Sequence, residues 1–282
     1  MRKKANALVF AVCFASSIAG YAATQDQEVV EVEAASIESL NDLAIDDYPI
    51  KTDPLKLGAA KDVNEALKST QVSEDDLKKY NSQKLIKLAV SYPGAFMYLA
   101  SNSPQQGIDT FVKTSSMVQE LYSRKDAPKE LLKFYSRFDH KLSTSNLSED
   151  KKNKVIIKLV NLTNIIGQYE VLDQLTDSQI KKLIDISYKN LVDMNDVSQE
   201  KYFDDIAKGS NALLLLRAMV KKSPDIVNNL TQDSKSFLKT GGQFNSLINN
   251  EIINIAQIDI IYKNNILKIN FPVNRHDDGE PF

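Results

Sequence analysis

The chain has 282 residues, of which 26% are charged, and a formal net charge of −2 at pH 7. This near balance excludes the strongly basic surface with which proteins hold nucleic acids, so we expect no nucleic-acid partner. Cys13 is the only cysteine, so the rest of the chain has neither a disulfide framework nor a thiol for catalysis or zinc binding, and its length allows a core that is stable without them.

The first 22 residues have the three parts of a secretory signal peptide. Basic residues at positions 2–4 precede an apolar stretch at 7–18, and the small-x-small triplet 20–22 follows it. Because the apolar stretch is short and a polar, acidic segment follows, an uncleaved anchor is the weaker interpretation. The sequence predicts an exported bacterial protein, periplasmic or secreted, with no transmembrane segment after cleavage of residues 1–22.

Residues 23–60 form an acidic segment. Between positions 23 and 50 there are eight Asp or Glu residues and neither Lys nor Arg. The segment has too little apolar surface to offset the entropy lost on ordering, which predicts a disordered leader. The alternative is an acidic arm that binds a basic partner or folds back onto the body of the protein.

Residues 61–256 have the signals of a helical domain. An aliphatic residue followed by Ser or Thr and then by an acid or Gln recurs at Val72-Ser73-Glu74, Leu147-Ser148-Glu149, Leu175-Thr176-Asp177, Val197-Ser198-Gln199 and Leu230-Thr231-Gln232. The hydroxyl can accept a hydrogen bond from a free N–H of the first helical turn. At Thr176, Gln179 completes a capping box. Further helix starts are indicated by Pro93, Pro104, Pro128 and Pro224.

Apolar residues recur at helical spacing in the segments 104–122, 149–166 and 177–192. The middle segment has one apolar side, made of Val155, Ile156, Leu159, Val160, Thr163 and Ile166. Its polar side is made of Lys151, Lys154, Lys158 and Asn161. The spacing predicts three amphipathic helices that bury one side each.

The most apolar run after the N-terminus is Ser210–Ser223, which predicts the helix around which the others pack. Gly209 is expected to end a preceding helix and Ser210 to cap this one. The run is too short to span a bilayer and carries Arg217 in its middle. We therefore expect a buried helix.

Residues 257–282 predict a β-hairpin and a C-terminal tail. Apolar residues alternate at Ile258, Ile260 and Tyr262, Asn264-Asn265 can form a tight turn, and the alternation resumes at Leu267, Ile269 and Phe271. The alternative is that the preceding helix, carrying Phe244, Leu247, Ile248, Ile252 and Ile255, continues to Ile266. The predicted fold is all-α, a multi-helix bundle or an irregular α-solenoid of helical repeats, with this small hairpin.

Function is predicted mainly by exclusion, since the sequence has no local motif for nucleotide, cofactor or metal binding, and we expect neither a cofactor nor a metal. The leading hypothesis is an interaction protein that binds a protein, a peptide or a small apolar ligand in a groove between helices. Candidate groove residues are the aromatic residues near helix junctions, Tyr92, Phe96, Tyr98, Tyr135 and Phe138. The competing interpretation of these residues is ordinary core packing.

The first alternative function is a secreted hydrolase centred on His140, with Arg137 and Asp139 as weak candidates beside it. Adjacent helical residues point about 100° apart, so Asp139 is poorly placed to orient the His140 ring. A histidine that favours the helix C-terminus is the simpler interpretation. The second alternative is an envelope-associated structural protein that offers its hairpin edge to a partner strand.

Overall fold

The computed structural model describes residues 48–50, 70–92, 95, 101–137, 147–196 and 205–263. All of them belong to one compact unit, residues 35–282. These residues form twelve helices and contain no strand, so the prediction of an all-helical fold is confirmed for this part of the chain. None of the helices described there is long and apolar enough to cross a membrane. The predicted signal peptide lies outside the described residues.

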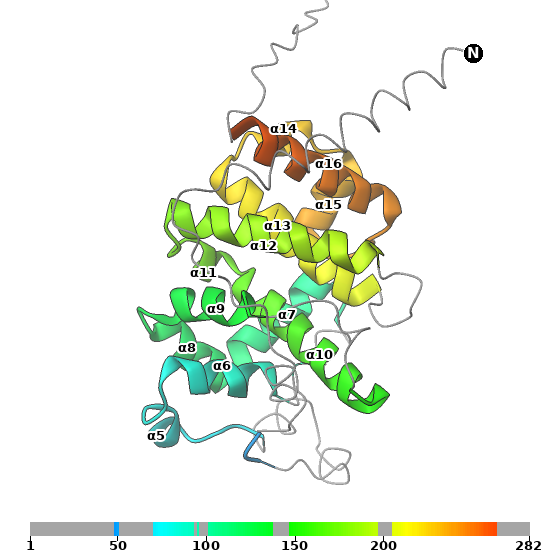
Figure 1. The fold of residues 1–282 in the computed structure, drawn as a ribbon. Helices are drawn as coiled ribbons and strands as arrows, with labels where there is room; N and C mark the ends of the chain where they lie inside the picture. Colours follow the sequence, from blue (N-terminus) through cyan, green and yellow to red (C-terminus); the bar gives the residue numbers. More distant parts are fainter. Residues whose placement is uncertain are drawn as a thin grey trace, which may run out of the picture. The chain divides into compact units, whose positions relative to one another are not determined.

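The helices follow one another along the chain as shown in Figure 1. They are α5 (Glu74–Leu77), α6 (Ser82–Val90), α7 (Pro104–Thr114), α8 (Ser116–Ser123), α9 (Ala127–Tyr135), α10 (Glu149–Ile166), α11 (Tyr169–Leu172), α12 (Asp177–Asp196), α13 (Asp205–Lys222), α14 (Ile226–Asn229), α15 (Gln232–Thr240) and α16 (Ser246–Lys263). α6, α8 and α9 contact one another, as do α12, α13 and α16, and α10 contacts α6, α9 and α13. α10 therefore joins the two groups.

Side-chain caps begin several helices as predicted. The Thr176 hydroxyl accepts the N–H of Gln179 at 3.3 Å, and the Gln179 side chain accepts the N–H of Thr176 at 2.9 Å, so the capping box is confirmed. Ser73 caps α5 and Thr231 caps α15 through their hydroxyls. Ser148 precedes α10 without such a bond, and the cap motif at 197–199 lies outside the described residues.

The segment 104–122 is two helices rather than one. Ser115 has an extended backbone, with φ −84° and ψ 106°, and its hydroxyl accepts the N–H of Val118 at 3.4 Å. It thus ends α7 and caps α8. Apolar spacing alone did not indicate this break, because the apolar stripe continues on both sides of it.

The central position of α13 is confirmed, because every residue from 211 to 219 is buried and the helix contacts α10, α12, α15 and α16. The predicted helix end at Gly209 and cap at Ser210 are wrong, because α13 begins at Asp205 and runs through both. A Cβ atom at Gly209 would lie 3.3 Å from the Phe244 side chain. This glycine therefore permits close packing and does not break the chain.

The bounds and apolar side of α10 are confirmed, but its predicted polar side is partly wrong. Lys158 and Asn161 are buried, because α10 packs against helices of both groups and buries more than one stripe. The amide of Asn161 donates to the backbone carbonyl of Val90 at 2.9 Å, which joins α10 to the end of α6.

The first strand of the predicted hairpin is wrong, because residues 257–263 continue α16. Extending a helix adds one hydrogen bond per ordered residue, whereas a hairpin needs a new nucleus. Ile248, Ile252 and Ala256 form the buried stripe of α16, but Leu247, predicted on its apolar side, is exposed. The predicted turn and second strand lie outside the described residues.

Candidate functional site

Arg217, in the middle of α13, is only 3% exposed. Its Nη1 donates to the backbone carbonyl of Gly167 at 3.1 Å, and its Nη2 donates to the side-chain oxygen of Gln105. The buried Nε–H has no hydrogen-bond partner among the described residues. No carboxylate among the described residues lies within ion-pair distance of this guanidinium. A buried charge thus stands without an ion-pair partner in the described part.

Three segments distant in sequence bring these groups together. Gln105 is in the first turn of α7, and Gly167 follows the last residue of α10. The amide nitrogen of Gln105 donates to Asp109 at 2.6 Å and to the side-chain oxygen of Gln168 at 3.1 Å. A Cβ atom at Gly167 would lie 2.9 Å from the backbone oxygen of Thr163, which is too close for a real side chain. Glycine therefore suits the turn after α10 whose carbonyl reaches Arg217.

Tyr169 covers the guanidinium on one side. Its ring centroid lies 5.6 Å from Cζ of Arg217, and the residue is 45% exposed. We call Arg217, Gln105, Gly167, Gln168 and Tyr169 the Arg217 centre. The guanidinium of Arg217 therefore contacts two residues that reach the surface, the partly exposed Tyr169 and the half-buried Gln105.

Burial lowers the pKa of Arg217, while the nearby groups of Tyr169, Asp109 and Glu170 raise it. The side chain stays charged, because the pKa of a guanidinium lies far above neutrality. The carbonyl end of α10 also favours a cation at this position. The positive charge is therefore compensated by dipoles, by a ring and by two carboxylates beyond ion-pair distance, and not by a direct partner.

The chemistry of the Arg217 centre is that of binding. A guanidinium presents planar pairs of N–H donors that match the two oxygens of a carboxylate. The other groups of the centre are amides and a phenol, which are poor nucleophiles and poor bases at neutral pH. The arrangement can hold and orient an anion but has no evident group to attack a substrate.

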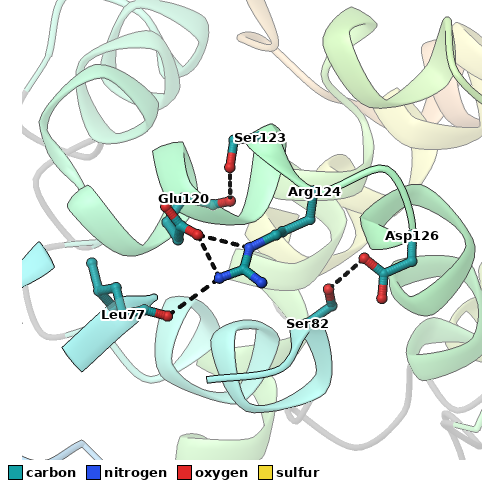
Figure 2. Close-up of polar contacts among 6 residues, drawn as sticks. All are labelled: Leu77, Ser82, Glu120, Ser123, Arg124 and Asp126. Carbon is teal, nitrogen blue, oxygen red and sulfur yellow. Dashed lines mark hydrogen bonds and ion pairs between the residues drawn. The ribbon is translucent and has the colours of Figure 1, made fainter. Parts of the chain in front are cut away.

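A second arginine, Arg124 at the end of α8, shows the contrasting arrangement in Figure 2. Its Nε donates to Oε1 of Glu120 at 2.7 Å, and its Nη2 lies 2.5 Å from the same oxygen. Nη2 also reaches the carbonyl of Leu77 at 3.5 Å, near the end of α5. Beside it, the Ser82 hydroxyl donates to Asp126 at 2.7 Å. This cluster joins α5, α6, α8 and α9, and its one arginine has a direct carboxylate partner.

Tyr92, a predicted groove residue, is buried. Its ring lies 5.9 Å from that of Phe111 in a stacked arrangement, and its hydroxyl accepts hydrogen bonds from Thr70 and Gln71. Tyr48 packs against the same ring at 5.7 Å. Tyr48, which lies in the predicted leader, therefore packs on the helical body.

Tyr135, another predicted groove residue, is also fully buried. Its hydroxyl donates to Asn211 and lies 3.4 Å from the Ser187 hydroxyl, and Asn190 donates to it at 3.1 Å. Burial raises the pKa of Tyr135 to about 12, against the opposing effect of the hydrogen bonds from Ser187 and Asn190. Because Tyr92 and Tyr135 have no partner in common among these contacts, the structure places them in two separate internal networks.

Of the other predicted site residues, the structure describes only one, Arg137. Arg137 follows α9 and is exposed. Phe96, Tyr98, Phe138, Asp139 and His140 lie outside the described residues. The groove and the hydrolase centre therefore stay predictions.

Comparisons with protein-family models, with curated proteins and with solved structures find no match to this chain. In the part of the chain that the structure describes, no group of three or more His, Cys, Asp or Glu residues could hold a metal ion. The candidate site therefore rests on the residues of this chain alone.

Sequence reasoning noted Arg217 only as a charge that argues against a membrane span, and it predicted no member of the Arg217 centre as a site residue. A charged residue in the middle of the most apolar run was the available signal, since a lone charge in a buried helix requires partners. Gln105, 112 positions earlier, had no comparable signal. Nor did Gln168 or Tyr169, because ordinary polar residues near a helix end predict nothing specific.

Proposed function

We propose that the chain is an exported, all-helical binding protein that holds a peptide or protein partner at the Arg217 centre. The observation that carries this proposal is the buried guanidinium whose Nε–H finds no partner in the described part of the chain. Burying a charge without a paired counter-charge costs several kcal/mol, roughly, so such a group is expected where it has a use. Ionisable groups with strongly perturbed surroundings concentrate at functional sites.

The position of the Arg217 centre supports a binding role. It lies where the first turn of α7, the end of α10 and the middle of α13 meet, which is a junction between helices of the kind in which helical proteins build ligand sites. Its polar lining favours a peptide or protein group over a purely apolar ligand. Export is supported by the basic, apolar and small-residue parts of segment 1–22.

We also propose that the helices form a compact bundle and not a solenoid. In a solenoid each unit contacts only its neighbours along the chain. Here α7 contacts α15, more than one hundred residues later, and a Cβ atom at Gly241 would lie 3.4 Å from Pro104. A single core explains this contact between early and late helices.

The test is affinity capture with three forms of the purified chain: the wild type, Arg217→Met and Arg124→Met. Mass spectrometry identifies what each form retains. The proposal predicts a partner that the wild type and Arg124→Met retain and that Arg217→Met loses. Arg124→Met is the matched control, because it removes an arginine whose counter-charge is already present. Recovery of the same partners by all three forms would contradict the proposal.

A further inference from the structure

Arg124 and Arg217 differ in what lies opposite the guanidinium edge formed by Nε and Nη2. In Arg124, both Nε and Nη2 face one carboxylate oxygen of Glu120. In Arg217, Nη2 faces the neutral amide oxygen of Gln105, and Nε faces no acceptor. The edge that holds a carboxylate in one case therefore lacks one in the other.

The charge around Arg217 limits what can occupy this edge. Asp109 and Glu170 are close enough to affect its pKa, so their field opposes any incoming anion. Coulomb repulsion doubles for a dianion relative to a monoanion at the same distance. A singly charged, planar carboxylate is therefore favoured over a phosphate.

Both neighbours of the edge reach the protein surface. Gln105 is half-buried and holds Arg217 through a neutral amide oxygen, while its amide nitrogen donates to Asp109 and Gln168. A carboxylate oxygen is a stronger acceptor for a guanidinium than this amide oxygen and would compete for the same Nη2–H. Tyr169 is 45% exposed and covers the guanidinium through a cation–π contact, which is worth about 0.5 to 1 kcal/mol at an exposed site. Rotation of this ring away from Arg217 would uncover the guanidinium on that side.

We infer that the Arg217 centre recognises a single carboxylate, as at the C-terminus of a peptide, through Nε and Nη2 of Arg217, with Tyr169 as its movable cover. This inference rests on the proposed function and adds the chemical class of the bound group. The carboxylate would give the Nε–H an acceptor and supply the counter-charge. The C-terminus of a peptide presents such a planar, singly charged group, and Asp and Glu side chains present it as well.

The experiment follows the arginine Nε–H resonances of the ¹⁵N-labelled full chain by NMR during two titrations at constant ionic strength. The probes are N-acetylglycine, which has a carboxylate, and N-acetylglycinamide, which does not. Arg217→Lys removes one resonance and thereby assigns it, and the Nε–H of Arg124 serves as an internal control.

The inference predicts that N-acetylglycine shifts the Arg217 resonance saturably, that the amide leaves it in place, and that the Arg124 resonance stays constant. Equal responses to both probes, or no response to either, would overturn it. If capture of a partner still depends on Arg217 while the carboxylate probe has no effect, the proposed site stands and the ligand class is wrong. If neither result depends on Arg217, the proposed function fails as well.

Discussion

Arg124 and Arg217 show two ways of placing an arginine between helices. The Arg124 side chain is 29% exposed and pairs with Glu120 four residues earlier on the same helix. Arg217 is almost fully buried, and its acceptors are oxygens of Gly167 and Gln105, one from the backbone and one from an amide. The first arginine completes a surface network, whereas the second leaves a donor unused in the interior.

The difference indicates which of the two is structural. A matched, half-exposed pair is inexpensive to keep and contributes little, because its charges remain partly solvated. A buried charge without an ion-pair partner is costly, and an apolar residue of similar volume would often serve stability better. This contrast supports the proposal of a binding role for Arg217 and predicts a structural role for Arg124.

The largest expected effect comes from truncating each arginine. Arg217→Ala should lower the free energy of unfolding by about 3 kcal/mol, because it leaves a cavity and two buried acceptors without a donor. Arg124→Ala should lower it by only about 0.5 kcal/mol, as expected for a partly solvated i,i+4 pair. Urea denaturation followed by circular dichroism measures both. Equal losses would remove the contrast between the two sites.

The second prediction separates the effect of the Arg217 side-chain volume from that of its charge. Arg217→Met should lower the free energy of unfolding by about 1 to 2 kcal/mol, less than Arg217→Ala, because Met fills most of the space and removes the buried charge, although the same two acceptors lose their donor. Partner capture should nevertheless be lost. A loss of stability as large as that of Arg217→Ala would instead assign the guanidinium to the structure of the fold.

The third prediction concerns the cover of the Arg217 centre. Tyr169→Ala should cost about 0.5 to 1 kcal/mol of stability through the lost cation–π contact. It should also speed the exchange of the Arg217 Nε–H with water while leaving that of Arg124 unchanged. An unaltered exchange rate at Arg217 would show that the ring does not control access.

The smallest expected effect concerns Glu251, a carboxylate that, like Glu120, has its hydrogen-bond donors in place. Glu251 accepts the backbone N–H of Thr231 at 2.7 Å and hydroxyl hydrogen bonds from Thr231 and Ser234. Burial acts to raise its pKa, but these hydrogen bonds, with Ser234 first, lower it overall below the ordinary value of 4.5. Glu251 thus helps to hold α16 on the first turn of α15.

A carboxyl whose pKa is lower in the folded state stabilises the fold above its unfolded pKa, and this contribution is lost as pH falls through the folded value. Glu251→Gln should therefore cost less than about 1 kcal/mol at pH 7, and the difference from the wild type should shrink below pH 4.5. Thermal unfolding across pH 3 to 7 tests this, at roughly unit steps. A difference that is independent of pH would contradict it.

Local chemistry made much of the helical fold predictable. The start of α12 at Asp177 follows from the capping box of Thr176 and Gln179, and the burial of α13 follows from its apolar run. The wrong predictions came from contacts between helices, which a local pattern does not show. Gly209 resembles a helix end in sequence, but its value to the fold is the space it leaves for Phe244.

The candidate site was predictable only through Arg217 itself. Its partners come from α7 and from the turn after α10, and no local pattern links positions that far apart. The predicted aromatic groove illustrates the opposite problem. Tyr92 and Tyr135 have a clear pattern of aromatic residues near helix ends, yet both hydroxyls lie in internal hydrogen-bond networks. Spacing along a helix does not distinguish a groove from a core.

The most direct test of the account is the rate at which the Nε–H protons of Arg124 and Arg217 exchange with water, measured in one NMR spectrum. If Arg217 is enclosed as described, its proton exchanges only when the structure opens and should be at least about tenfold slower than that of Arg124. Exchange at Arg217 as fast as at Arg124 would show a solvated guanidinium. The buried charge on which the proposed function depends would then not exist.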